Sequence, residues 1–189
     1  MLGKKDMLRT LLRFENLQQI MGNDQLWVIL LTDPDKRRAL SVVCDDEQAR
    51  QILIRLKGNR DVTKTMLPEA LLQLLPSSYE MLVVGVFDGQ YQVMLMDTSN
   101  GNSVRVRMSD AVMLSVISHI PLYIEQRLMD RQSVPFDEHA TGVAIPINSM
   151  DVARLKAALA HAVEEENYEL ASQLRDEINR RTSVQNHPA

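Results

Sequence analysis

Three groups of polar side chains in this chain could take part in chemistry. Asp45, Asp46 and Glu47 are consecutive, and clustered carboxylate oxygens are the ligands that Mg²⁺ and Mn²⁺ prefer. Because a helical pattern follows directly, the same acids also suit the first turn of a helix, where they complement its dipole. Ser109 and Asp110 stand at the start of a second helical pattern, and helix capping alone explains both residues. We therefore expect helix N-termini at both places, with a metal site as the alternative at the first.

The third group is basic. Lys36, Arg37 and Arg38 form the only dense cluster of positive charge in a chain whose net charge is −4. Since the chain as a whole repels phosphates, any contact with nucleic acid has to use a local basic surface of this kind. The cluster follows a turn signal at Pro34, so a solvated turn between two strands is the simpler interpretation.

Several other chemistries lack the residues they need. The sequence contains no G-x-G-x-x-G or Walker A loop, no H-E-x-x-H and no paired C-x-x-C. Its histidines, His119, His139, His161 and His187, have no metal-ligand spacing. The single cysteine, Cys44, cannot form an internal disulfide, which indicates a reducing compartment. No apolar window has the length of a membrane span and no signal peptide pattern opens the chain, so we expect a cytoplasmic protein without membrane contact.

Hydrophobic periodicity predicts two successive units with the same order of elements, strand, strand, strand, helix. A strong hairpin signal, Asp-Gly between two apolar runs, lies inside the second unit. The sequence therefore predicts an α+β fold, in which a mixed β-sheet domain is built from two β(3)-α repeats. The expected strands are 9–15, 25–32, 38–44, 79–86, 91–97, 103–107 and 121–124, and the expected helices begin near Asp45, Thr65, Ser109 and Glu125.

The C-terminal part has a different character. Residues 135–148 contain two prolines and a glycine without a sustained period, which is typical of a linker. Two amphipathic helical patterns follow over 149–181, and helices of this length are marginal in water unless they pack together or onto something else. We therefore expect an α+β domain over 1–134, the linker, an antiparallel α-helical hairpin over 149–181 and a disordered tail over 182–189.

The hairpin resembles a known motif. Its first helix carries the spacing Leu-x3-Leu-x2-Ala-Val from Leu155, and its second carries Tyr-Glu-x-Ala-x2-Leu-Arg-Asp from Tyr168. This run resembles the UVR motif, which occurs in subunits of the bacterial nucleotide-excision repair nuclease and in some adaptors of bacterial proteolytic machinery. The resemblance implies protein binding, often to another hairpin of the same kind, and assigns partner contacts to Tyr168, Leu174, Arg175 and Asp176. A plain hairpin that folds back on its own domain is the alternative.

Stretches of the preceding domain are similar to another family. Residues 40–58 match its strand and helix, residues 60–67 (RDVTKTML) align with Arg-Pro-x-Thr-His-Asp-Leu-Leu, and residues 107–112 (RMSDAV) align with Arg-Pro-Ser-Asp-Ala-Ile. With the closing Pro-Leu-Tyr-Ile at 121–124, they resemble the bifunctional nuclease (BFN) domain of bacteria and plants, over roughly residues 7–134. That family is credited with DNase and RNase activity, and a BFN domain followed by a UVR hairpin recurs in it.

The resemblance to the BFN domain assigns site residues. Arg60, Thr63, Arg107, Ser109 and Asp110 occupy polar positions of the family pattern and are the implied catalytic residues. Phosphodiester hydrolysis needs a base or a metal-activated water, together with cations that stabilise the developing charge. Asp110 is the carboxylate at the matched positions, so the resemblance implies that Asp110 binds Mg²⁺ or Mn²⁺. The implied partners are DNA or RNA, and the implied assembly is a homo-oligomer.

The chain departs from the family pattern at several positions. Gln48 stands where the family has Glu, Lys64 and Thr65 stand where it has His-Asp, and Asp45 replaces a glycine. The phosphate-binding half of a nuclease is thus better preserved than the half that activates water. Two functions remain open: a bifunctional nuclease that hydrolyses phosphodiester bonds, or a catalytically degenerate scaffold or adaptor that recruits a partner through the hairpin. A nucleic-acid binder that does not cut is a third.

Overall fold

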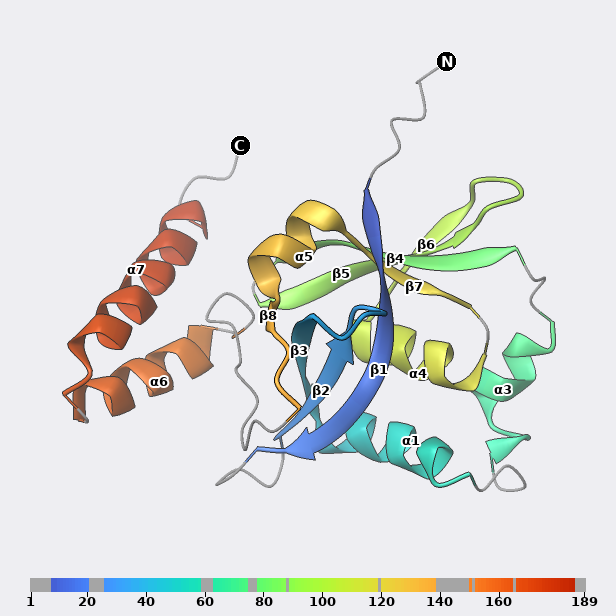
Figure 1. Ribbon diagram of the computed structural model, residues 1–189, viewed down its shortest axis with the longest axis horizontal. Coiled ribbons are helices and arrows are strands. Elements are labelled where there is room, and N and C mark those ends of the chain that lie inside the picture. Colours follow the sequence, from blue (N-terminus) through green and yellow to red (C-terminus); the bar gives the residue numbers. More distant parts are fainter. Residues whose placement is uncertain are drawn as a thin grey trace, which may run out of the picture.

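The computed structural model combines a mixed β-sheet, helices packed on it and a C-terminal pair of helices (Figure 1). The α+β fold predicted from the sequence, with two β(3)-α repeats and a helical hairpin, is confirmed. The structure describes residues 8–20, 26–58, 63–74, 78–87, 89–118, 120–138, 150, 152–164 and 166–185.

Within the described residues, the strands form one eight-stranded sheet. They are β1 (Arg9–Gln19), β2 (Leu26–Thr32), β3 (Arg38–Asp45), β4 (Tyr79–Phe87), β5 (Gln90–Asp97), β6 (Ser103–Val106), β7 (Leu122–Glu125) and β8 (Val134–Pro135). Their order is β6-β5-β4-β7-β1-β2-β3-β8. Paired strands are antiparallel except β4 and β7, which are parallel. Each repeat is therefore a three-stranded meander, and β7 joins the two meanders.

Helices α1 (Asp46–Leu56) and α4 (Met108–Ile117) follow the third strand of each repeat and pack against each other beside the sheet (Figure 1). Side chains alternate between the two faces of a strand, and the apolar ones on one face form a core with both helices. Ile29 of the sheet, Ile52 of α1 and Val112 of α4 are almost completely buried in this core. Each such side chain stabilises the fold by about 1.5–3 kcal/mol, so the core holds both helices against the sheet.

The two helices begin in different ways. Asp45 is the N-cap of α1, where its carboxylate accepts the backbone N–H of Gln48 at 2.8 Å and its own N–H donates to the Gln48 side chain at 3.4 Å. This reciprocal pair is a capping box. Helix α4 begins at Met108, and its N-cap, Arg107, makes no side-chain capping bond. The prediction that Ser109 caps this helix is wrong, because Ser109 lies inside its first turn.

A short helix, α3 (Leu67–Leu72), begins two residues after the predicted start at Thr65, and Pro68 lies in its first turn, where proline is tolerated. Its Glu69 accepts hydrogen bonds from Arg55 of α1 at 2.8 and 2.9 Å. The Arg55 side chain is only 2% exposed. This buried ion pair attaches α3 to the end of α1.

The sheet continues past the predicted domain boundary at Val134. After α5 (Gln126–Gln132), strand β8 pairs Pro135 with Arg38, and the N–H of Phe136 donates to the turn before β3 at 2.9 Å. The predicted linker therefore begins too early, since a proline that suggested a linker is also tolerated in an edge strand. The remainder of the predicted linker, from residue 139, lies outside the described residues.

The C-terminal hairpin consists of α6 (Val152–Glu164) and α7 (Tyr168–Gln185). Asn167 caps α7, because its side-chain oxygen accepts the N–H of Leu170 at 3.2 Å. Helix α7 continues to Gln185, so it extends into the segment predicted as a disordered tail. None of the described helices combines the length and hydropathy needed to cross a membrane. The hairpin has a core of its own, made of Leu155, Ala162, Ala171, Leu174 and Ile178.

Candidate functional site

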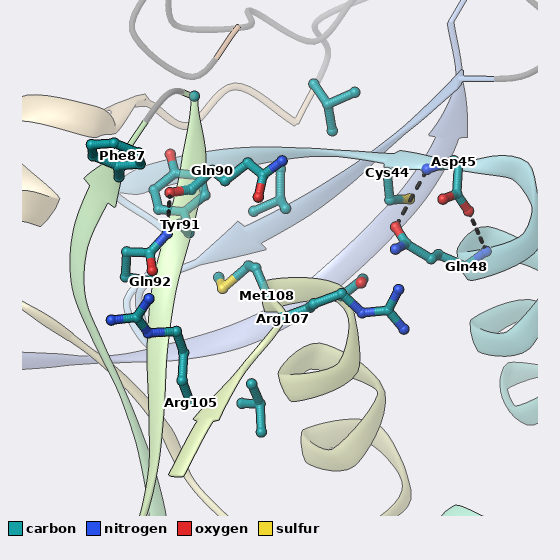
Figure 2. Close-up of a pocket in the computed structure, with 15 residues that line it drawn as sticks. Cys44, Asp45, Gln48, Phe87, Gln90, Tyr91, Gln92, Arg105, Arg107 and Met108 are labelled. Carbon is teal, nitrogen blue, oxygen red and sulfur yellow. Dashed lines mark hydrogen bonds between the residues drawn. The ribbon is translucent and has the colours of Figure 1, made fainter. Parts of the chain in front are cut away.

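A pocket of about 630 Å³ lies where the third strand of each repeat ends and its helix begins (Figure 2). One wall is the end of β3 with the start of α1, and the opposite wall is formed by β5, β6 and the end of β4. The start of α4 lies between these walls. Among the described residues, the charged ones in the lining are Asp45, Arg105 and Arg107. The duplication explains this site, because both repeats bring a junction of strand and helix to one place.

The start of α4 presents backbone donors to the pocket. The first N–H groups of an α-helix have no acceptor within the helix, and Arg107 provides no side-chain cap for them. Met108 and Ser109 both line the pocket and are buried. These N–H groups and the positive end of the helix dipole make this part of the pocket suited to an anion.

Arg107 forms an ion pair with Asp110 one turn further along α4. Its Nε donates to Oδ2 at 2.7 Å and its Nη2 donates to Oδ1 at 3.2 Å. This hydrogen bonding raises the pKa of Arg107, and the charge of Asp45 across the pocket adds to the rise. The Arg107 side chain is nevertheless 70% exposed. An exposed pair of this kind contributes about 0–1 kcal/mol, so an incoming phosphate can compete with Asp110 for the guanidinium.

Arg105 is the second cation of the pocket lining. It lies opposite Met94 in the ladder between β5 and β6, and Figure 2 shows its guanidinium beside Gln92. Within the part of the chain that the structure describes, Arg105 forms no ion pair. Its charge is therefore more available to a phosphate than that of Arg107, which Asp110 partly neutralises.

The wall opposite α1 also carries an exposed aromatic ring and amides. Phe87, at the end of β4, is 72% exposed and lines the pocket beside Gln90 and Tyr91 (Figure 2). Tyr91 is 5% exposed, and burial raises the pKa of its hydroxyl. Among the described residues, nothing forms a hydrogen bond with that buried hydroxyl. An unsatisfied buried hydroxyl destabilises the fold by about 1–3 kcal/mol. Such groups are uncommon in native structures and occur at functional sites.

The carboxylates near the pocket do not fit a divalent cation. Asp110 is engaged by Arg107, and Asp45 caps α1. Asp46 accepts a hydrogen bond from Trp27 and pairs with Arg50. Among the described residues, no three side chains of His, Cys, Asp or Glu are grouped so that they could hold a metal ion. Since Mg²⁺ and Mn²⁺ require several oxygen ligands, we derive no step through a metal.

The structure brings together some of the residues assigned by resemblance. Arg107, Ser109 and Asp110 are all in the first turn of α4 or next to it. Thr63 is buried and does not line the pocket, and its backbone carbonyl accepts the N–H of Met66 at 2.8 Å. Arg60 lies outside the described residues, as do three of the four histidines.

The basic cluster at the turn between β2 and β3 is largely used in structural contacts. Lys36 donates to Glu15 at 2.7 Å, and Arg38 donates its Nε to the hydroxyl of Ser133 at 2.7 Å. Arg37 is exposed and lies 3.8 Å from Asp35. The interpretation of this cluster as a solvated turn therefore agrees with its contacts better than a role in binding nucleic acid.

The partner residues assigned to the hairpin differ in their exposure. Tyr168 is 68% exposed, and Arg175 and Asp176 are exposed and lie 3.4 Å apart. Leu174 is 1% exposed and belongs to the hairpin core. The expectation that Leu174 contacts a partner is therefore corrected: it stabilises the hairpin, and the other three residues are available on its surface.

The fold and the pocket define a class of protein, a two-repeat α+β domain with an anion-compatible pocket, followed by a helical hairpin. Residues 29–137, more than half of the chain, match the model of the bifunctional nuclease domain, and residues 152–180 match the UvrB/UvrC motif. The protein belongs to the bifunctional nuclease domain family. A comparison with curated proteins found no sequence that matches.

Sequence reasoning missed Arg105, Phe87 and Gln90 as pocket residues. Arg105 lies in the expected strand 103–107, and the alternation of side chains along a strand predicts which residues share its face of the sheet. That pattern does not reveal which strand lies beside it, and the pocket depends on the register of β5 with β6. Phe87 and Gln90 lie in the predicted hairpin turn between the strands 79–86 and 91–97. Side chains in such a turn are usually expected to face solvent, whatever their polarity.

Proposed function

We propose that this protein is a nuclease that binds a phosphodiester group of DNA or RNA in the pocket and hydrolyses it. The observation that carries the proposal is the meeting of Arg105, Arg107 and the uncapped start of α4 in one pocket. Positive groups and backbone N–H donors are what stabilise the charge that develops on a phosphodiester during hydrolysis. Membership of the bifunctional nuclease domain family supports the same reaction class.

The proposed roles follow from position. Arg107 and the first N–H groups of α4 bind the non-bridging oxygens of the phosphate, and Arg105 binds the same or the adjacent phosphate. Asp110, on the first turn of α4, is the carboxylate closest in sequence to these donors and is proposed as the base that orients water. When a phosphate takes the place of Asp110 on Arg107, the carboxylate is released for that role.

A nuclease assay on purified full-length protein tests this function, with single-stranded DNA and RNA as substrates. We expect Asp110→Asn to abolish cleavage while binding of the substrate becomes tighter, because the competing charge on Arg107 is removed. Arg37→Gln, at an exposed arginine outside the pocket lining, is the matched control and retains cleavage. Cleavage that persists in Asp110→Asn contradicts the assignment of this residue and indicates another site or a contaminating nuclease.

A binder that does not cut is a second candidate, and a specific observation favours it. The side chain of Gln48, which stands where the family pattern has Glu, is held in the capping box of α1. Asp45 caps the same helix, and Asp110, which is not part of the pocket lining, is engaged by Arg107. An adaptor that holds nucleic acid and recruits a protein needs no water-activating group. Binding without cleavage by the wild-type protein, with every divalent metal supplied, would select this candidate.

We propose that the hairpin recruits a protein partner through the surface that carries Tyr168, Arg175 and Asp176. Its match to the UvrB/UvrC motif supports this role, and these side chains are exposed while its apolar core is already internal. Deletion of residues 149–189 should remove the partner from an affinity purification, and an unchanged partner set would contradict the proposal. Assembly into a homo-oligomer in the cytoplasm is part of the same proposal, and light scattering on the full chain tests the assembly.

A further inference from the structure

We infer that the pocket takes a single-stranded segment of nucleic acid, with one unpaired base stacked on Phe87 and the neighbouring phosphate bound by Arg105 and the start of α4. The inference rests on the proposed function and adds to it the form of the substrate. Its starting point is the ring of Phe87, which is 72% exposed at the border of a pocket whose lining also carries charged and amide side chains.

Packing among the described residues does not explain the position of Phe87. It ends β4, opposite Gln90 in the ladder with β5, and it does not belong to the apolar core. Aromatic residues are scarce in this chain, at 4%, so an exposed ring is not a consequence of composition. Bases stack on aromatic rings whatever their sequence, because every base has a π-face.

The amide of Gln90 provides polar recognition beside the ring. Gln90 is exposed and lines the pocket, and its side-chain amide forms no hydrogen bond with the described residues. An amide carries both donors and an acceptor, which suits the edge of an unpaired base. The Watson–Crick edge of a base is unavailable in a duplex, where it already pairs with the opposite strand.

The register of the strands places ring and phosphate donors at the same end of the sheet. Phe87 of β4 lies opposite Gln90 of β5. Three residues further along β5, Val93 lies opposite Val106 of β6, and Val106 directly precedes Arg107, the N-cap of α4. The volume of about 630 Å³ lies in the range of small-molecule sites, roughly 300–1,000 Å³. A pocket of this size accommodates a nucleotide and excludes a double helix.

The charges of the two walls indicate on which side the strand lies. Asp45 is on the wall formed by β3 and α1, while Arg105 is on the wall that also carries Phe87. A phosphate is repelled by Asp45 and attracted by Arg105. The backbone of the strand therefore follows the wall of β5 and β6, which brings its base to Phe87 without crossing the pocket.

Fluorescence anisotropy on the full-length protein tests the inference, with labelled oligo(dT), oligo(rU) and a DNA duplex of equal length at low salt. We expect tighter binding to the single strands than to the duplex. Phe87→Ala should weaken single-strand binding about ten-fold, which is the magnitude of one lost base–aromatic stack. Phe87→Trp should retain binding, and Leu74→Ala, at an exposed apolar residue outside the pocket lining, is the matched control and should bind like wild type.

Phe87→Trp adds a direct readout of stacking. The chain contains one tryptophan, Trp27, so fluorescence quenching by oligo(dT) that appears in Phe87→Trp and not in wild type reports a base on the new ring. The DNA and RNA arms show whether the 2′-hydroxyl contributes. Equal affinity for duplex and single strand, or wild-type affinity of Phe87→Ala, overturns the inference. The proposed phosphate site is still supported in that case if Arg107→Gln weakens binding. A wild-type protein that binds none of the three probes overturns the proposed function as well.

Discussion

At the scale of single residues, the two arginines of the pocket have unequal surroundings. Arg107 shares its charge with Asp110, whereas Arg105 forms no ion pair with any of the described residues. Resemblance to the family indicated Arg107, because this residue belongs to the run RMSDAV, which aligns with the family pattern. Arg105 is the stronger candidate for binding a phosphate, because a phosphate can pair with Arg105 without displacing a carboxylate.

Arg105→Gln should therefore weaken the binding of single-stranded DNA about ten-fold at low salt, since a hydrogen bond to a charged group is lost. The dependence of log affinity on log salt concentration should fall in magnitude by about 0.7, which corresponds to one phosphate contact on a single strand. Anisotropy titrations at several salt concentrations measure both effects. Arg37→Gln removes an exposed arginine outside the pocket and serves as the control; an identical salt slope in both variants would show that Arg105 does not touch phosphate.

At the scale of elements, most of the fold could be predicted from the sequence because the strands and helices of both repeats have a strong hydrophobic periodicity. The strands of both meanders are found within a few residues of their expected positions, and Gly58 ends α1 with a φ of +71°, as a helix-stopping glycine should. Strand β8 was missed because two residues carry no periodicity and one of them is a proline. The start of α4 was misjudged because Ser109 has the chemistry of a cap, but helix formation begins one residue earlier, at Met108.

The attachment of α3 to α1 depends on an ion pair that sequence patterns do not reveal. Arg55→Met removes the cation and leaves Glu69, whose side chain is 14% exposed, without its partner. We expect a loss of about 3 kcal/mol in the free energy of unfolding, because an uncompensated buried charge is costly. The double variant Arg55→Met with Glu69→Leu should recover most of this loss. Urea denaturation measures all three proteins.

Arg50→Met is the matched control for this series, because Arg50 forms an exposed i,i+4 pair with Asp46 on the same helix. Loss of an exposed pair should cost no more than about 1 kcal/mol. If Arg50→Met and Arg55→Met are equally destabilising, the burial of the Arg55–Glu69 pair has no energetic consequence.

The hairpin contains a carboxylate that links its stability to pH. Glu177 of α7 accepts hydrogen bonds from Arg180 at 2.7 and 2.9 Å and from Arg181 at 2.8 Å. The hydrogen bonding from Arg180 is the main reason why the pKa of Glu177 lies below its ordinary value. The unfolded chain therefore binds a proton at a higher pH than the folded hairpin does. The resulting stability is present above about pH 4.3, the ordinary pKa, and is lost as the pH falls through the lowered pKa.

Amide hydrogen exchange of the full-length protein, read on peptides from α7 and corrected for the intrinsic pH effect, measures this stability. We expect Glu177→Gln to reduce the protection of α7 at pH 7 by about 1 kcal/mol, and to reduce it less at a pH below the lowered pKa of Glu177, where the folded chain also carries this group protonated. Glu169→Gln, in the first turn of the same helix, is the control. A deficit of equal size at both pH values would mean that the carboxylate charge is not the source of the stability.

At the scale of the whole molecule, the charge distribution decides how nucleic acid can approach. The net charge of −4 repels a polyanion, and the basic cluster at the turn between β2 and β3 is mostly engaged by neighbouring groups. Among the described residues, the pocket brings two arginines and the start of α4 together with a single carboxylate, Asp45. A local site of this kind favours a short stretch of strand over an extended duplex, which needs many phosphate contacts for comparable affinity.

The same distribution predicts that binding does not require a divalent cation. The carboxylates near the pocket are held by Arg107 and by the cap of α1, so they do not form a metal site that would bridge protein and phosphate. The affinity for a single-stranded oligonucleotide should stay within about two-fold when Mg²⁺ is replaced by EDTA at matched ionic strength, since screening by salt is then the same in both solutions. Asp110→Asn should behave in the same way, because no metal ligand is lost. Affinity that collapses on chelation in the wild type, and is insensitive to it in Asp110→Asn, would instead show that Asp110 leaves Arg107 to bind a metal when the nucleic acid is present.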